Sequence, residues 1–153
     1  MNRRMVLVMA AACFAGVMSL VAADLNMGSW KLNEAKSKFE PGAPKNRMVV
    51  VEAAGDNVKV TVDGVDGSGK AIHNEWTGKF DGKDYPVTGD SNADARSYTR
   101  VDDHTMSLSQ KKGGKVVTSG RIVIAQDGKS RTVTVTTEAQ GKKSTSTAVY
   151  DKQ

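Results

Sequence analysis

The chain has 153 residues, of which 39% are apolar and only 5% are aromatic. This length allows one ordinary globular domain and excludes a large multidomain enzyme. The formal net charge is +5, but lysines and arginines are scattered among acidic residues and form no long basic run, so we expect no nucleic-acid partner. The interior must consist mainly of Val, Ala, Leu and Thr, a composition that suits strands and turns.

Residues 1–23 have the pattern of a secretory signal peptide. Two arginines open the chain, residues 5–20 carry no charge, and small residues at positions 21 and 23 precede Asp24. The uncharged stretch is short for a membrane-spanning helix. We therefore expect an exported protein, periplasmic or extracellular, whose mature domain spans residues 24–153 and has no stable membrane span. Cys13 leaves with the signal, so the mature chain has neither a disulfide nor a thiol nucleophile.

From residue 28 onward, apolar and polar residues alternate. In residues 57–63, Val58, Val60 and Val62 interleave with polar side chains, as in a half-buried strand. Asp-Gly and Gly-Gly pairs between such runs favour tight hairpin turns. The pattern predicts about eight to ten strands, near residues 28–33, 47–54, 57–64, 70–80, 84–88, 95–101, 104–111, 115–126, 130–139 and 144–151.

The connections favour one architecture. Residues 33–39 can form one or two helical turns because Asn33 is a good N-cap, and Pro41 with Gly42 ends them. Hairpin-linked strands leave two unpaired edges unless the sheet closes on itself. We therefore predict an all-β, antiparallel up-and-down barrel with a short helical turn after the first strand. A two-sheet sandwich is the alternative. We expect a monomer.

Aromatic and basic residues suggest where a ligand binds. Trp76 and Phe80 share a strand face and either line a cavity or fill it. Arg96, Tyr98 and Arg100 also alternate on one face, and a guanidinium beside a phenol suits a carboxylate or phosphate in a barrel mouth. The alternative, which we favour, places both arginines on the outer face with Tyr98 lying over neighbouring strands.

The remaining polar motifs do not indicate catalysis or a metal. Residues 90–94 supply oxygen ligands at alternate positions, but Ala95 and Val101 stand where an EF-hand needs Gly and Glu, so we favour a solvated loop over the mouth. His73 and His104 are expected at the surface. The sequence has no zinc motif and no nucleophile elbow. We expect no enzyme activity, no cofactor and no metal.

The sequence also resembles a known group of proteins. The segments GSWKLN at 28–33, KSKF at 36–39, DGKDYPVTG at 81–89 and AVYDK at 148–152 are similar to small exported bacterial proteins described as lipocalin-like. The resemblance implies a calycin-type barrel in which Trp30 plugs one end against an arginine, either Arg121 or Arg131. With the barrel pattern, it implies a protein that binds a small apolar or amphipathic, lipid-like molecule. The alternative is an envelope protein-interaction module, such as an inhibitor or stress factor.

Overall fold

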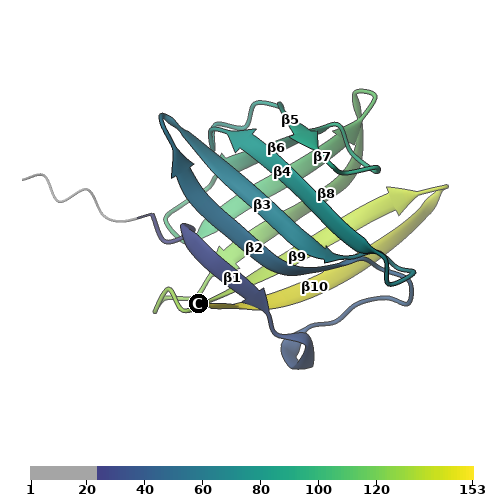
Figure 1. The fold of residues 1–153 in the computed structure, drawn as a ribbon, viewed down its shortest axis with the longest axis horizontal. Helices are drawn as coiled ribbons and strands as arrows, with labels where there is room; N and C mark the ends of the chain where they lie inside the picture. The colour runs from purple at the N-terminus through teal and green to yellow at the C-terminus, as the bar shows by residue number, and fades with distance from the viewer. Residues whose placement is uncertain (1–23) are drawn as a thin grey trace, which may run out of the picture.

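The computed structural model describes residues 24–153, which form ten strands and one short 3-10 helix (Figure 1). The predicted signal peptide, residues 1–23, lies outside the described residues. The elements are β1 Gly28–Leu32, η1 Glu34–Lys36, β2 Lys45–Ala54, β3 Asn57–Val65, β4 Ala71–Gly78, β5 Tyr85–Thr88, β6 Ala95–Arg100, β7 Thr105–Lys112, β8 Lys115–Ile124, β9 Ser130–Ala139 and β10 Lys142–Lys152.

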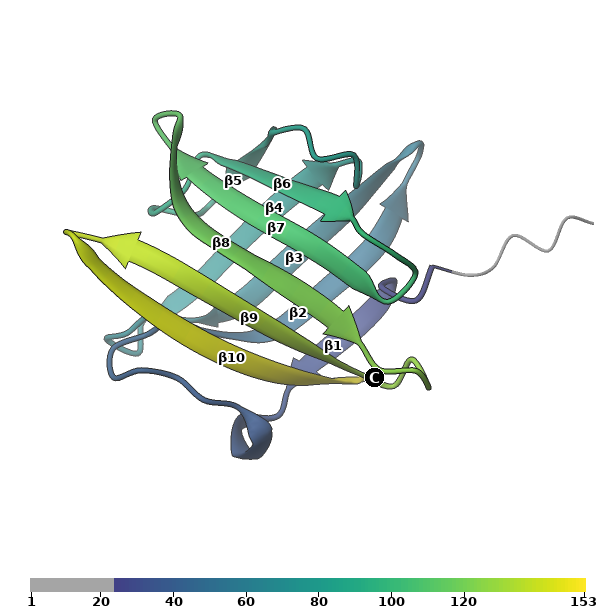
Figure 2. The ribbon, with the colours of Figure 1, turned by 180° about the vertical axis from the view of Figure 1, so that it is seen from behind.

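The ten strands form one closed antiparallel barrel. Each strand pairs with the next along the chain, and β10 pairs back with β1, as the two opposite views show (Figures 1 and 2). The predicted up-and-down barrel is therefore confirmed, and the two-sheet sandwich is wrong. Closure gives the first and last strands a hydrogen-bonded neighbour on both sides, which removes the exposed edges of an open sheet.

Local sequence explains the tight connections. Gln140 and Gly141 join β9 to β10, and both have positive φ, 52° and 74°, as a type I′ turn requires. The predicted helical turn is present as η1. It begins after Asn33, whose side-chain oxygen accepts a hydrogen bond from the backbone N–H of Lys36 at 3.2 Å.

The predicted alternation places the core inside the barrel. On β3, Val60 and Val62 are buried, whereas Thr61 between them is only half-buried. Equivalent positions on the other strands, together with Ala93 from the connection between β5 and β6, complete a core of Trp30, Val49, Val51, Val60, Val62, Trp76, Val87, Ala93, Tyr98, Met106, Leu108, Ile122, Ile124, Ala148 and Tyr150. Large aromatic side chains in this list lie at inward positions on β1, β4, β6 and β10.

The two ends of the barrel differ. We call one the closed end: it holds residues 24–27 and the connections at 55–56, 79–84, 101–104 and 125–129. We call the other the mouth: it is formed by residues 33–44 and by the connections at 66–70, 89–94, 113–114 and 140–141. In Figure 1 the start of the described chain and the C-terminus both lie on the side of the closed end.

Candidate functional site

Trp30 fills the closed end. Its side chain is fully buried, and its indole N–H donates a hydrogen bond to the backbone oxygen of Asn26 at 3.0 Å. The guanidinium of Arg131 lies over the indole ring, 4.7 Å from its centroid. Arg121 is exposed on β8, on the face opposite to buried Ile122. The structure therefore selects Arg131 as the arginine that contacts Trp30.

Arg131 carries a buried charge at this end. Its Nη1 donates a hydrogen bond to the side-chain oxygen of Asn26 at 2.7 Å, and the ring of Tyr150 lies 5.3 Å from the guanidinium. Burial lowers the pKa of Arg131 to about 10, so the group is charged at neutral pH. Burial also raises the pKa of Tyr150 to about 12. Two aromatic rings and one amide thus stabilise the cation in place of a carboxylate.

Arg100 also lies toward the closed end. It forms an ion pair with Asp24, and its guanidinium lies 5.7 Å from the centroid of the Phe80 ring. Arg96 stands four residues earlier on β6, toward the mouth. The hypothesis that Arg96, Tyr98 and Arg100 bind one ligand in the mouth requires the two arginines to converge. They do not converge, because they lie toward opposite ends of β6.

Trp76 and Phe80 belong to an aromatic cluster inside the barrel. Trp76 stacks with Phe80 at 6.2 Å between centroids and meets Tyr85 and Tyr98 edge-on at 5.7 and 4.8 Å. A Cβ at Gly78 would lie 2.5 Å from the Tyr85 ring, so the cluster requires glycine there. Of the two interpretations left open by the sequence, the structure favours the one in which these side chains fill the interior.

Arg96 is inside the barrel, which corrects the expectation that it faces solvent. Its side chain is only 5% exposed. Its Nη2 donates a hydrogen bond to the side-chain oxygen of Asn74 at 3.1 Å, and its backbone oxygen accepts the indole N–H of Trp76 at 2.8 Å. Asp90 forms an ion pair with Nη2 at 3.5 Å. The Nε of Arg96 has no hydrogen-bond partner among the described residues.

Asp90 also changes the interpretation of the loop that links β5 to β6. The sequence indicated a solvated loop over the mouth, and Ser91, Asn92 and Asp94 are indeed exposed. Asp90, in contrast, turns toward Arg96, and its side chain is only 15% exposed. This loop therefore supplies a carboxylate to the interior, which the spacing of its acidic residues did not reveal.

Hydrogen-bonding side chains form a row across the inner wall near the mouth. Strand register places Arg96 opposite Gln110, Gln110 opposite Thr118, Thr118 opposite Thr137 and Thr137 opposite Ser144. We call these five residues the inner polar row. The next inward row toward the closed end is mostly apolar and consists of Tyr98, Leu108, Gly120, Val135 and Ser146. The inner wall thus changes from polar to apolar with depth.

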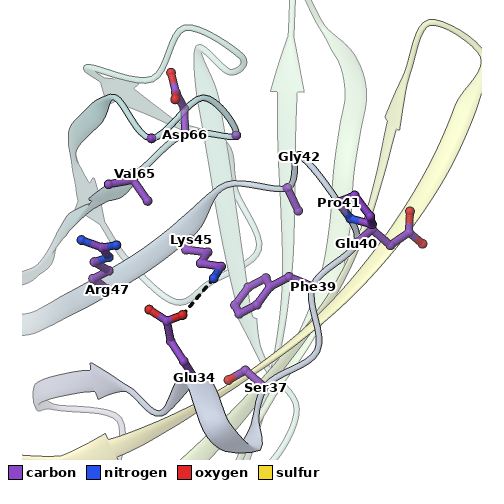
Figure 3. A pocket seen from close by; sticks show the side chains of 13 residues that line it. Glu34, Ser37, Phe39, Glu40, Pro41, Gly42, Lys45, Arg47, Val65 and Asp66 are labelled. Atoms are coloured by element: carbon purple, nitrogen blue, oxygen red, sulfur yellow. Dashed lines mark hydrogen bonds and ion pairs between the residues drawn. The ribbon is translucent and has the colours of Figure 1, made fainter.

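Two pockets lie at the mouth. The larger, about 540 Å³, lies between residues 33–44 and the connection between β3 and β4, where Phe39, Lys45 and Arg47 line it (Figure 3). Lys45 forms an ion pair with Glu34 at 2.8 Å. The smaller, about 330 Å³, is bounded by Asn92, the start of β8 and the end of β9, and includes two members of the inner polar row, Thr118 and Thr137. Sequence reasoning missed both pockets because they depend on which loops meet.

The histidines lie apart from the mouth pockets. His73 is exposed on β4, as expected, and the Asp63 carboxylate, 2.6 Å from its Nδ1, raises the pKa of the imidazole. His104 is half-buried, with Nδ1 3.1 Å from the backbone oxygen of Ile124.

Within residues 24–153, no three His, Cys, Asp or Glu side chains are grouped to hold a metal ion. No helix in that range is long and apolar enough to cross a bilayer.

Comparisons with known proteins identify the fold. No protein-family model and no curated protein matches the chain. A solved structure of a redesigned β-barrel, mFAP1, bound to DFHBI shares 16% identity with a TM-score of 0.49, over 86% of this chain and 98% of that one. EF1p2_mFAP2b bound to DFHBI shares 12% identity with a TM-score of 0.51, over 86% of this chain and 97% of that one. The second match shows that this chain shares the fold of a solved barrel.

Proposed function

We propose that residues 24–153 form an exported, non-catalytic barrel that binds a small, partly apolar molecule through the mouth. The difference between the two ends is the observation that carries this proposal. At the closed end, Trp30 is fully buried beneath residues 24–27. At the opposite end lie two pockets, and the smaller one adjoins an inner wall that is polar at the rim and apolar below.

The inner wall near the mouth is also incompletely covered. Gln110, Thr118, Thr137 and Ser144 face the interior but are only half-buried, and Val135 below them is only partly buried. A fully packed barrel would bury such inward side chains as completely as it buries Met106 or Trp76. This partial exposure favours a lumen that a guest enters from the mouth.

Two further observations support the proposal. The basic start and uncharged stretch of residues 1–23 favour export. A barrel of the same fold, EF1p2_mFAP2b, is bound to a small molecule, DFHBI. We place the protein in the periplasm or outside the cell, as a monomer.

Binding is tested with the neutral fluorescent probe N-phenyl-1-naphthylamine and with native mass spectrometry of the mature protein isolated after export. We expect saturable probe fluorescence, and loss of a bound small molecule when the protein is denatured. Ala148 faces the interior on β10 and is 7% exposed, so Ala148→Trp fills the lumen and should abolish probe binding. No saturable binding by the unmodified protein, together with stoichiometric capture of an envelope protein, would favour the protein-interaction alternative.

A further inference from the structure

Arg96 and Asp90 form an ion pair at the mouth. The distance between them, 3.5 Å, is long for two side chains that are largely buried. We propose, on the basis of the function proposed above, that the ligand carries one carboxylate group. This carboxylate replaces that of Asp90 as the ion-pair partner of Arg96. Asp90 then serves as an internal substitute for the ligand in the free barrel. The contacts of both side chains carry this proposal.

Arg96 has hydrogen-bonding capacity that the free barrel leaves unused. A guanidinium has five N–H donors, yet in the described chain the side chain of Arg96 makes one hydrogen bond, to Asn74, besides its ion pair. Within the part of the chain that the structure describes, its Nε has no hydrogen-bond partner, although only 5% of the side chain is exposed. A buried donor without an acceptor destabilises the protein, because it has lost water and gained nothing in return. A carboxylate accepts two parallel N–H groups and so matches the guanidinium of Arg96 in geometry and charge.

Asp90 holds Arg96 only loosely. The distance from Oδ2 to Nη2 is 3.5 Å, whereas a well-formed charge-assisted hydrogen bond spans about 2.7–2.9 Å. The other oxygen of Asp90 accepts a hydrogen bond from the backbone N–H of Asn92 at 2.9 Å, so the carboxylate is already used in its own turn. A free carboxylate without that second partner can approach Arg96 more closely and bond to Nε as well.

The loop that carries Asp90 is anchored on both sides. Gly89 has φ +79°, and a Cβ there would lie 2.3 Å from the backbone oxygen of His73, so the chain runs tightly against β4 at this point. Ala93 is 2% exposed and belongs to the core. Between these anchors, Asp90 faces Arg96 while Asn92 lines the smaller mouth pocket. Residues 90–92 therefore link the wall of that pocket to the Arg96 contact along the chain.

The inner polar row continues from Arg96 toward the pocket. Gln110 is the neighbour of Arg96 on β7, and Thr118, next to it on β8, lines the smaller pocket. Thr118 and Thr137 share a hydrogen bond at 3.1 Å. A bound carboxylate thus finds amide and hydroxyl donors beside the guanidinium, while an apolar tail extends over Leu108 and Val135 in the row below.

The experiment compares decanoate with decan-1-ol as competitors of N-phenyl-1-naphthylamine on the mature protein. The two competitors differ in charge but share the same apolar chain. We expect decanoate to displace the probe at a concentration about tenfold lower, and Arg96→Gln to remove this preference, because one charge-assisted contact accounts for about a factor of ten or more. Asp90→Asn removes the internal competitor and should strengthen decanoate binding about three- to tenfold while leaving decan-1-ol unchanged.

Arg121→Gln is the matched control, because it removes the same charge from the exposed face of β8 and should change neither competitor. Circular dichroism verifies that each variant is folded. If Arg96→Gln fails to fold, the opposite effect expected of Asp90→Asn still decides. Equal affinity for the two competitors, or weaker decanoate binding by Asp90→Asn, overturns the inference while leaving the proposed function in place. Absence of probe binding by the unmodified barrel removes the proposed function and this inference with it.

Discussion

Removal of the Asn26 side chain should destabilise the closed end. Asn26→Ala deletes the oxygen that accepts the Arg131 Nη1 hydrogen bond at 2.7 Å but keeps the backbone oxygen that accepts the Trp30 indole. Among residues 24–153, Nε of Arg131 has no hydrogen-bond partner, so the variant leaves the buried guanidinium with the rings of Trp30 and Tyr150 as its remaining contacts in this range. A buried hydrogen bond to a charged group contributes about 1.5–3 kcal/mol. We therefore expect the free energy of unfolding to fall by about 2–3 kcal/mol.

The assay is thermal and urea unfolding of residues 24–153 at pH 7, followed by circular dichroism. For the 130 residues of this range, an unfolding entropy of about 2.1 cal/mol/K per residue converts that loss into a fall in Tm of about 7–11 °C. Asn26→Asp keeps an acceptor and should retain most of the stability. Asn46→Ala removes an exposed amide and should change stability by less than about 0.5 kcal/mol. A loss for Asn26→Ala no larger than that of Asn46→Ala would refute the reasoning.

Three other predictions concern single side chains. Gly78→Ala places a Cβ 2.5 Å from a Tyr85 ring carbon and should cost about 1–3 kcal/mol in urea unfolding; a neutral effect would mean that the aromatic cluster rearranges freely. The folded-state pKa of Tyr150, about 12, lies above its usual value of 10.0, so its contribution is complete below pH 10 and is lost as pH rises toward 12, by about 3 kcal/mol in all. Burial lowers the pKa of Arg131 to about 10, so the contribution of that residue rises with pH over the same range; urea unfolding at pH 9–12 should therefore show the Tyr150 loss as a fall in stability of the unmodified protein relative to Tyr150→Phe. Asp63 raises the pKa of exposed His73, so this pair stabilises the fold at low pH and the effect disappears as pH rises through the raised pKa; an NMR titration should show a lower pKa in Asp63→Asn.

The order and number of strands were predictable from the sequence because each strand has a local signal. Val58, Val60 and Val62 mark an inward face by themselves, and the Gly113-Gly114 pair marks the turn between β7 and β8 without help from distant residues. Closure followed from physical reasoning about unpaired edges. The observed strand ends differ from the predicted ones by a few residues. For example, β4 ends at Gly78, whereas the sequence predicted an end at residue 80.

The site was less predictable because its contacts are not local. Alternation placed Arg96, Tyr98 and Arg100 on one face, but the other face of β6 carries Ser97 and Thr99, so polarity did not identify the inward side. Burial of Arg96 depends on Asn74, 22 positions earlier in the sequence. The arginine beside Trp30 depends on Asn26, which lies 105 positions from Arg131. No periodic pattern reports such partners.

The junction between the first and last strands has a consequence for how the molecule assembles. Only three residue pairs, from Trp30 with Lys152 to Leu32 with Tyr150, join β1 to β10, and they bring together opposite ends of the polypeptide. Neighbouring hairpins form early because little loop entropy opposes them, whereas this junction requires the whole chain. Until residues 142–152 have been synthesised, the partly formed sheet has two edge strands whose backbone hydrogen-bonding groups are unpaired. A chaperone that shields them during that interval would protect the molecule from aggregation.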